Sequence, residues 1–204
     1  MKAIIPERQI PQRCDWSVND LLYIDYHDKE WGTPLHDDKK LFEFLILEGF
    51  QEGLSWFTIL KKREHFKKAF DDFNPNKIVL YDNKKITGLM NNSFIIRNQL
   101  KINSAVLNAK AFLTVQNEFG SFDKYIWQFS DGRTIRNSWK NIKTIPPTSK
   151  VSDLMSKDLK KRGFKFVGST ICYAFMQAVG IVNDHVITCF RYKELSAKGG
   201  SAFG

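Results

Sequence analysis

The core of the predicted fold is one apolar run with an acidic start, Asp37-Asp-Lys-Lys-Leu-Phe-Glu-Phe-Leu-Ile-Leu-Glu48. Acidic residues directly before an apolar run are typical of a helix N-terminus. Leu41, Leu45 and Glu48 are spaced i, i+4 and i+7, so they lie on one face of that helix. The run therefore predicts a buried helix that carries a carboxylate on its apolar face.

Helical spacing continues on both sides of this run. In the segment 55–70 the apolar residues fall on an inward face, while Lys61, Lys62 and Arg63 fall outward. No stretch alternates apolar and polar residues between turns, so the predicted fold class is all-α. A glycine-rich tail over 196–204 is predicted to be disordered. Helices are predicted over 55–70, from Pro75, over 86–112 with a break near 91–94, from a Ser152 cap to about 162, over 165–182 with Gly180 ending or kinking it, and over 183–192.

The composition is that of an ordinary globular chain. Among 204 residues, 31 Lys and Arg stand against 22 Asp and Glu, a net charge of +9, and 43% are apolar. This balance excludes a disordered or collagen-like chain, and the length predicts one domain or two merged lobes. Three cysteines are too few for a disulfide framework and indicate a reducing compartment. The longest uncharged stretch, 166–183, contains Gly168 and Gln177 and predicts a buried helix rather than a membrane span.

Two Cys and His pairs lie near opposite ends of the chain. Cys14 and His27 form the first pair, and His185 and Cys189 form the second at i and i+4, a spacing that places both side chains on one face of a helix. Two thiolates and two imidazoles make a closed tetrahedral zinc set of the structural kind. The spacing between the pairs is not that of a standard zinc finger, so chance proximity is the alternative from the pattern alone. The third cysteine, Cys172, is predicted to be a small core residue.

Aromatic residues gather near the N-terminus and around the apolar run. Aromatic faces are what proteins use to hold a nucleobase that has left its stack, although rings of this kind also form ordinary core. Glu48 is the harder residue to assign to the core, because a buried carboxylate needs a partner or a raised pKa. Its alternative is a structural salt bridge. The cluster comprises Trp16, Tyr23, Tyr26, Trp31 and Trp56.

Basic residues concentrate in one region of the chain. Between Arg136 and Lys165 nine Lys and Arg stand against two Asp, and Lys61 to Arg63 and Lys67 to Lys68 add a further group. Such a surplus favours a polyanionic partner such as DNA, while a solvated face and an anionic membrane surface are the alternatives. Within this region we predict that Lys160 and Lys161 bind phosphate without reading sequence.

Several strings along the chain match one family when they are read together. In these strings the chain resembles the DNA-3-methyladenine glycosylase I family, bacterial base-excision repair enzymes of the helix-hairpin-helix DNA glycosylase superfamily. The resemblance covers nearly everything from residue 13 to about residue 189. The strings are Arg13-Cys-Asp-Trp, Tyr23-Ile-Asp-Tyr-His-Asp-Lys-Glu-Trp-Gly, Leu47-Glu, Gly53-Leu-Ser-Trp, Leu60-Lys-Lys-Arg-Glu, the segment 156–178 and Asn183-Asp-His-Val.

The resemblance implies a fold and a set of site residues. The fold is one glycosylase module over 13–192, with a zinc-bound lobe (13–35 plus 150–192) and a helical lobe with the hairpin (36–149). One structural Zn²⁺ per chain would join the N-terminal and C-terminal segments through Cys14, His27, His185 and Cys189. Gly53 and Leu54 correspond to the plug that fills the gap in the duplex. The implied base pocket is Glu48 with Tyr26, Trp56, Trp16, Tyr23 and Trp31.

The resemblance also implies the activity. The chain is expected to extrude 3-methyladenine from alkylated duplex DNA and remove it by hydrolysis, with free 3-methyladenine as product and no lyase step. It is expected to be a monomeric cytoplasmic enzyme that acts at the bacterial nucleoid. Two departures from the superfamily stand out: the hairpin stretch 91–101 has no glycine, and no catalytic aspartate is assigned. The rival readings are a non-catalytic, zinc-containing DNA-binding protein and a glycosylase for another base such as 3-methylguanine.

Overall fold

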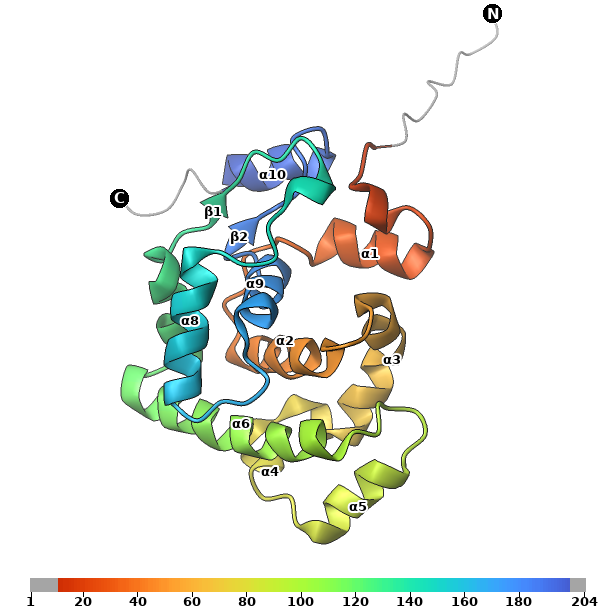
Figure 1. Ribbon diagram of the computed structural model, residues 1–204, viewed down its shortest axis with the longest axis vertical. Helices are drawn as coiled ribbons and strands as arrows, with labels where there is room; N and C mark the ends of the chain where they lie inside the picture. The colour runs from red at the N-terminus through yellow and green to blue at the C-terminus, as the bar shows by residue number, and fades with distance from the viewer. Residues whose placement is uncertain (1–10, 199–204) are drawn as a thin grey trace, which may run out of the picture.

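The computed structural model describes residues 11–198, and within them helices dominate, as predicted (Figure 1). Four 3₁₀ segments interrupt the helices at Asp15–Ser17, Asp71–Phe73, Gln128–Ser130 and Ile142–Thr144. The α-helices are α1 (Leu21–Lys29), α2 (Asp38–Gln51), α3 (Trp56–Ala69), α4 (Pro75–Ile78), α5 (Asn83–Asn91), α6 (Gln99–Phe119), α7 (Phe122–Trp127), α8 (Lys150–Lys161), α9 (Ser169–Ala178) and α10 (Phe190–Lys198).

Side-chain caps explain where most of these helices begin. Asp37 accepts a hydrogen bond from the backbone N–H of Lys40 at the start of α2, which confirms the predicted acidic start. Helix α8 begins earlier than predicted, because Ser149 rather than Ser152 is its N-cap. The Ser149 hydroxyl accepts from the N–H of Ser152, and the Ser152 hydroxyl accepts in return from the N–H of Ser149, a complete capping box.

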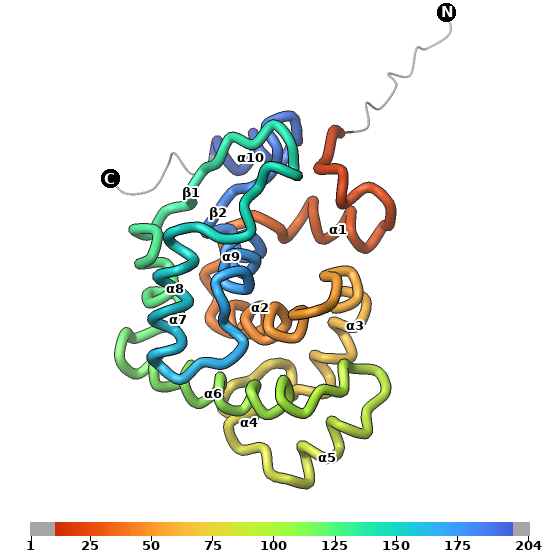
Figure 2. The backbone as a smooth tube through the Cα atoms, in the orientation of Figure 1, coloured from red at the N-terminus to blue at the C-terminus, as the bar shows by residue number. Residues whose placement is uncertain are grey.

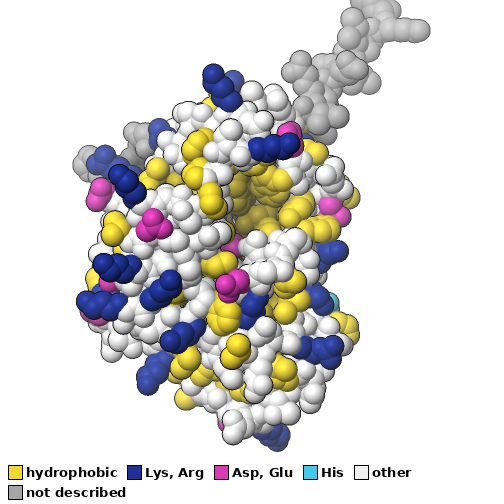
Figure 3. Space-filling view, in the orientation of Figure 1, with side chains coloured by type: hydrophobic (Ala, Val, Ile, Leu, Met, Phe, Trp, Pro, Cys, Tyr) yellow, Lys and Arg dark blue, Asp and Glu magenta, His cyan; other side chains and the backbone are white. Residues whose placement is uncertain are grey.

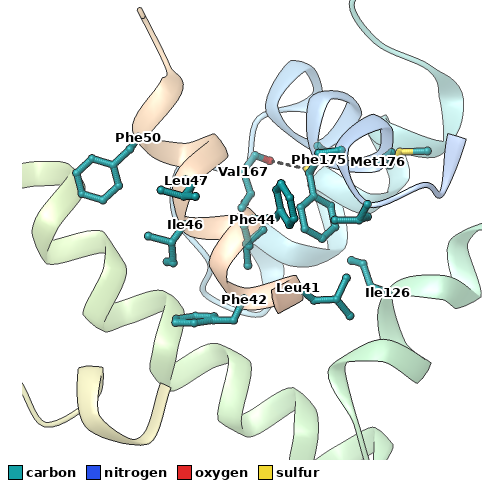
Figure 4. Close-up of a cluster of buried hydrophobic side chains, with 14 of the residues drawn as sticks. Leu41, Phe42, Phe44, Ile46, Leu47, Phe50, Ile126, Val167, Phe175 and Met176 are labelled. Carbon is teal, nitrogen blue, oxygen red and sulfur yellow. Dashed lines mark hydrogen bonds between the residues drawn. The ribbon is translucent and has the colours of Figure 1, made fainter. Parts of the chain in front are cut away.

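Helix α2 lies at the centre of the molecule, between α3, α6, α7 and α9 (Figure 2). Every residue from 41 to 50 is buried, including the predicted carboxylate at Glu48. In Figure 4, Phe42 and Phe44 leave α2 in different directions, and Phe44 lies near Phe175 of α9. The Phe42 ring packs 4.8 Å from the ring of Phe112 in α6. The apolar run is therefore the structural core, as its sequence pattern predicts.

A short parallel pairing of two strands accompanies the helices of this mostly helical fold. Strand β1 (Ile135–Arg136) pairs with β2 (Val182–Asn183), and Ile135 is opposite Val182. The helix predicted over 165–182 is shorter in the structure. It corresponds to α9, which spans Ser169–Ala178, and the chain turns at Gly180 with φ +75°. A Cβ atom at this glycine would lie 2.4 Å from the Thr33 carbonyl carbon, so only glycine fits where the N-terminal segment crosses.

Two further differences lie near the C-terminus. The helix predicted over 183–192 starts only at Phe190, and residues 184–189 form a loop after β2. The predicted disordered tail from 196 is wrong for its first residues, since α10 continues to Lys198. The remainder of the predicted tail, 199–204, lies outside the described residues. Within the described residues, no helix is both long enough and apolar enough to cross a membrane.

Two helices and a connecting loop occupy the stretch predicted to be the hairpin. Helices α5 and α6 are joined by residues 92–98, which confirms the predicted break, and Asn98 caps α6 by accepting from the N–H of Lys101. The hairpin residue Phe94 is 61% exposed and stacks on His65 of α3, with ring centroids 4.9 Å apart. The glycine-free hairpin is thus held against α3 by side-chain contacts.

Candidate active site

The four predicted metal ligands converge although they come from both ends of the chain. Cys14 precedes the first 3₁₀ segment, His27 lies in α1, and His185 and Cys189 lie in the loop between β2 and α10. Their ligand atoms all lie within 4.8 Å of one another and are buried. The Cys189 Sγ atom is 3.5 Å from both His27 Nε2 and His185 Nδ1. A sulfur and a nitrogen on one tetrahedral zinc ion are about 3.6 Å apart, so the spacing fits such an ion.

The loop geometry differs from the prediction for the second pair. His185 and Cys189 do not share a helix; a turn in which the Cys189 N–H donates to the Val186 carbonyl, at 2.8 Å, brings them together. A four-residue turn and a helical turn place i and i+4 side chains at similar separation. The prediction that the pair meets is therefore right, although its structural reason is wrong.

Polar partners around the cluster orient both imidazoles. His27 Nδ1 lies 2.8 Å from the Asp28 carboxylate, which also pairs with Arg13, and His185 Nε2 lies 3.0 Å from the Trp31 carbonyl oxygen. With the outer nitrogen of each ring bonded in this way, the inner nitrogen is left facing the two sulfurs. The Cys14 thiol, and after it the two imidazoles, lower the pKa of Cys189 far below that of an ordinary thiol. The cluster therefore stabilises a thiolate, the form that binds metals.

The five predicted aromatic residues form one connected group. The ring centroid of Trp16 lies 5.2 Å from that of Tyr23, 6.3 Å from that of Tyr26 and 5.1 Å from that of Trp31. Tyr26 in turn lies 5.4 Å from Trp56, which connects α1 to the start of α3. The group thus extends from the Cys and His cluster to the centre of the molecule.

Members of this aromatic group have different neighbours. Trp31 is buried against the Cys and His cluster, with its ring 4.6 Å from that of His185. Phe44 stacks on Trp56 with ring centroids 6.3 Å apart, a contact that the sequence pattern did not predict. The sequence does contain a sign that Phe44 lies near the pocket, because Phe44 and Glu48 are spaced i and i+4 and so share a face of α2.

Glu48 is buried beside this group without a partner. It is 2% exposed, and its Oε2 atom has no hydrogen-bond partner among the described residues. Burial raises the pKa of Glu48 to about 8. Its place in the last turn of α2 adds the unfavourable negative end of the helix dipole. The alternative for Glu48 was a structural salt bridge. Among the described residues, Glu48 forms no ion pair with any Lys, Arg or His.

A second polar atom near Glu48 also lacks a partner. The indole Nε1 of Trp56 is buried and has no hydrogen-bond partner among the described residues. The Trp56 ring packs on Tyr26, and the charge of Glu48 adds to the effect of burial in raising the Tyr26 pKa. A buried donor and a buried acceptor without partners are what a site offers to a polar ligand. Figure 3 shows a hollow with hydrophobic walls beside α1 and next to the α2–α3 connection.

Arg63 was predicted to face outward, and the structure corrects this. Its Nε donates to Glu43 at 2.7 Å and its Nη1 donates to Glu30 at 2.7 Å, while the guanidinium lies 4.9 Å from the centre of the Phe44 ring. This one side chain therefore joins α2 and α3 to the segment after α1. The prediction failed because Glu30 and Glu43 are remote from Arg63 in sequence.

The predicted DNA-contact residues fall in two separate places. Gly53 adopts φ +80° in open space after α2, and Leu54 beside it is 41% exposed. Lys160 and Lys161 are exposed in the last turn of α8, which lies on the opposite side of α2 from α3 (Figure 1). The structure therefore does not bring these lysines to the Gly53–Leu54 turn.

Comparison with known proteins gives a consistent result. The family model for "Methyladenine glycosylase" matches residues 16–192. The chain is 47% identical over 177 residues to the DNA-3-methyladenine glycosylase of Haemophilus influenzae, covering 87% of this chain and 96% of that protein. It is 46% identical over 181 residues to DNA-3-methyladenine glycosylase 1 of Escherichia coli, covering 89% and 97%.

A solved structure agrees with the sequence comparison. The chain superimposes with a TM-score of 0.85, at 34% identity, on a variant of 3-methyladenine DNA glycosylase I crystallised in complex with 3-methyladenine. This likeness covers 87% of this chain and 96% of that one, so it extends over nearly the whole fold. The chain belongs to the methyladenine glycosylase family.

Proposed function

We propose that this protein removes 3-methyladenine from alkylated duplex DNA by hydrolysis of the N-glycosyl bond. Relatives that bear the name DNA-3-methyladenine glycosylase match nearly all of the chain. A relative of similar structure binds 3-methyladenine itself. The single observation in this chain that carries the proposal is the buried, unpartnered carboxyl of Glu48 beside the rings of Tyr26 and Trp56.

The proposed pocket suits a cationic base. In DNA, an adenine methylated at N3 carries a positive charge, and its exocyclic amine is a hydrogen-bond donor. A carboxylate on Glu48 would accept from that amine and attract the charge, while Tyr26, Trp56, Trp16 and Tyr23 supply electron-rich rings. An opposite charge in the pocket lowers the pKa of a buried carboxyl, so the bound cation would ionise Glu48. A normal adenine lacks the charge and would bind more weakly.

The bond to be broken needs little chemical assistance. When the C1′–N9 bond breaks, its electron pair moves into the cationic base and leaves neutral 3-methyladenine. Water adds to C1′ and loses a proton to solvent, which leaves an abasic site. Lys101 is a buried lysine of α6, but its ammonium donates to two carbonyl oxygens and is not a free nucleophile. This supports a monofunctional enzyme without a Schiff-base lyase step.

We propose Zn²⁺ as the metal of the Cys14, His27, His185 and Cys189 cluster. All four positions would be filled by protein, which is the arrangement of a structural zinc site. When bound, zinc would hold α1, which carries Tyr26, against the loop after β2. Its part in the activity is therefore to hold one wall of the pocket in place.

We propose that Leu54 is the wedge that fills the space of the extruded base, and that Lys160 and Lys161 bind phosphate. The open backbone at Gly53 and the exposed side chain of Leu54 support the first proposal. Extrusion costs a few kcal/mol of stacking, which an inserted apolar side chain partly offsets. We expect the protein to act on duplex DNA as a monomer in the cytoplasm.

Incubation of the purified protein with methylated duplex DNA tests this function. Chromatography of the released bases should show 3-methyladenine, and the DNA should retain alkali-labile abasic sites without strand cleavage. Release of 3-methylguanine in preference to 3-methyladenine would assign the enzyme to another base. Binding of duplex DNA without release of any base would favour the non-catalytic DNA-binding protein instead.

A further inference from the structure

Lys101 of α6 is a buried cation bound to the backbone of another helix. Its residue is 7% exposed, and its ammonium donates to the carbonyl oxygen of Phe50 at 3.0 Å and to that of Glu52. No carboxylate pairs with it among the described residues. Burial lowers the pKa of the Lys101 ammonium below its ordinary value. Burying an ammonium group without a carboxylate partner costs free energy, so this side chain needs a compensating role.

The two carbonyl groups lie where α2 ends and the turn at Gly53 and Leu54 begins, which we call the wedge turn. Phe50 is in the last turn of α2, whose carbonyl oxygens lack partners within the helix, and Glu52 is its C-cap. A cation at this position also interacts favourably with the negative end of the helix dipole. The next residues are Gly53 and Leu54, and Glu48 lies one turn earlier. Lys101 therefore binds the chain at the point where α2, which carries Glu48, passes into the wedge turn.

The same face of α6 supports α2 at a second point. Asn108, two turns after Lys101, is buried, accepts from the N–H of Lys165 at 2.7 Å and donates to its carbonyl oxygen at 3.0 Å. These bonds hold the next residue, Phe166, which has a φ of +54°, against Gly49 of α2. A Cβ atom at Gly49 would lie 3.3 Å from the Phe166 Cβ, so this packing is tight.

We propose that Lys101 is a positioning residue of the excision reaction, which holds the wedge turn at a fixed height above α6. Helix α6 starts directly after the hairpin, so the same rigid helix would connect the DNA-facing hairpin to Leu54. The hairpin and the wedge would then meet the duplex as one unit. This inference rests on the proposed function, and it goes beyond it by assigning the wedge a support outside its own loop.

The Lys101→Met variant tests this role. Methionine keeps the apolar stem and removes the donors and the charge. Single-turnover release of 3-methyladenine from duplex DNA should fall roughly tenfold or more, because the variant loses both charge-assisted hydrogen bonds to the end of α2. Titration with free 3-methyladenine should show unchanged affinity, because the Lys101 ammonium is already bound to the carbonyl oxygens of Phe50 and Glu52. Lys101→Gln keeps a neutral NH₂ donor group, so its excision rate should lie between those of the wild type and Lys101→Met. It serves as the test if the methionine variant does not fold.

Two controls separate positioning from a general loss of stability. Lys110→Met removes an exposed lysine from the same helix and should leave both measurements unchanged. Leu54→Ala combined with Lys101→Met should be no slower than the slower single variant, because both changes remove the same wedge. The proposal would be overturned if Lys101→Met excised the base at the wild-type rate, or if it lost excision rate and free-base affinity equally. Additive effects on the excision rate in the double variant would also overturn it. Failure of the wild-type protein to release any base would instead overturn the proposed function.

Discussion

The ring of Tyr26 lies 5.4 Å from the ring of Trp56, inclined at 44°, although the two residues come from different helices. Helix α1 carries the first, α3 carries the second, and α2 carries Glu48 beside them. Three helices thus contribute one residue each to the candidate pocket. His27 of α1 belongs to the Cys and His cluster, and Glu30 directly after α1 binds Arg63 of α3, so the pocket depends on these links to hold α1 in place.

The first prediction concerns the link through Arg63. Arg63→Met leaves Glu43 buried without its cation and frees Glu30, so we expect a loss of about 2–4 kcal/mol in the free energy of unfolding. Affinity for free 3-methyladenine should fall as well, because α1 carries Tyr26. Urea unfolding and base titration measure the two effects. Arg162→Met is the matched control, since it removes an Arg that bridges Asp158 and Glu118 far from the pocket.

The Arg162 variant should cost no more than about 1 kcal/mol, because its partners are more exposed. Equal losses of stability in the two variants, or an unchanged base affinity in Arg63→Met, would show that Arg63 does not support the pocket.

The second prediction concerns the metal cluster. Cys189→Ser should reduce the zinc content from one ion per chain to a small fraction, because a closed structural site needs all four ligands. Stability should fall more than the free-base affinity of the folded fraction, since none of the four ligand residues belongs to the proposed base pocket. Elemental analysis and thermal unfolding measure these effects. A wild-type protein purified without chelator that holds no zinc would refute the assignment, whatever the variant shows.

The third prediction concerns Lys160 and Lys161. Replacing both by alanine should weaken binding to all duplexes alike and flatten the slope of log K against log salt by about one unit for each phosphate that the variant no longer binds. Binding titrations at several salt concentrations measure the slope. Because α8 lies on the opposite side of α2 from α3, free 3-methyladenine should bind normally. If the slope stays at its wild-type value, the two lysines belong to an ordinary solvated face.

The fourth prediction uses the raised pKa of Glu48. A carboxyl with a pKa of about 8 in the folded protein and 4.5 as its ordinary value binds more protons in the folded state between these limits. Stability should therefore fall as the pH rises from about 5 to 8, by up to about 1.4 kcal/mol per pH unit. Glu48→Gln should lack this decrease and be more stable than wild type at pH 8. Parallel stability curves from urea unfolding at four pH values would contradict the assignment.

How much the sequence predicts depends on how local the interaction is. The apolar run and its Asp37 cap were predictable, because spacing along one helix determines both. The meeting of His185 and Cys189 was also predictable, although a turn rather than a helix produces it. The role of Arg63 was not, since its partners Glu30 and Glu43 come from other elements.

The same limit applies to the remaining differences. A strand pairing of two residues, Ile135–Arg136 with Val182–Asn183, is too short to leave an alternating pattern. Lys101 looks like any surface lysine in the sequence, and only its approach to the end of α2 identifies it. Long-range packing therefore decided what local patterns left open.

The central claim is that Glu48 reads the extruded base, and single-turnover excision by Glu48→Gln tests it most directly. Glutamine keeps the size and one acceptor oxygen but removes the charge, so it separates electrostatics from shape. We predict that release of 3-methyladenine from duplex DNA and affinity for the free base both fall by about ten- to a hundredfold. Zinc content and non-specific DNA binding should be unchanged. If a folded Glu48→Gln protein excised the base at the wild-type rate, the aromatic rings alone would select the base and the central claim would be contradicted.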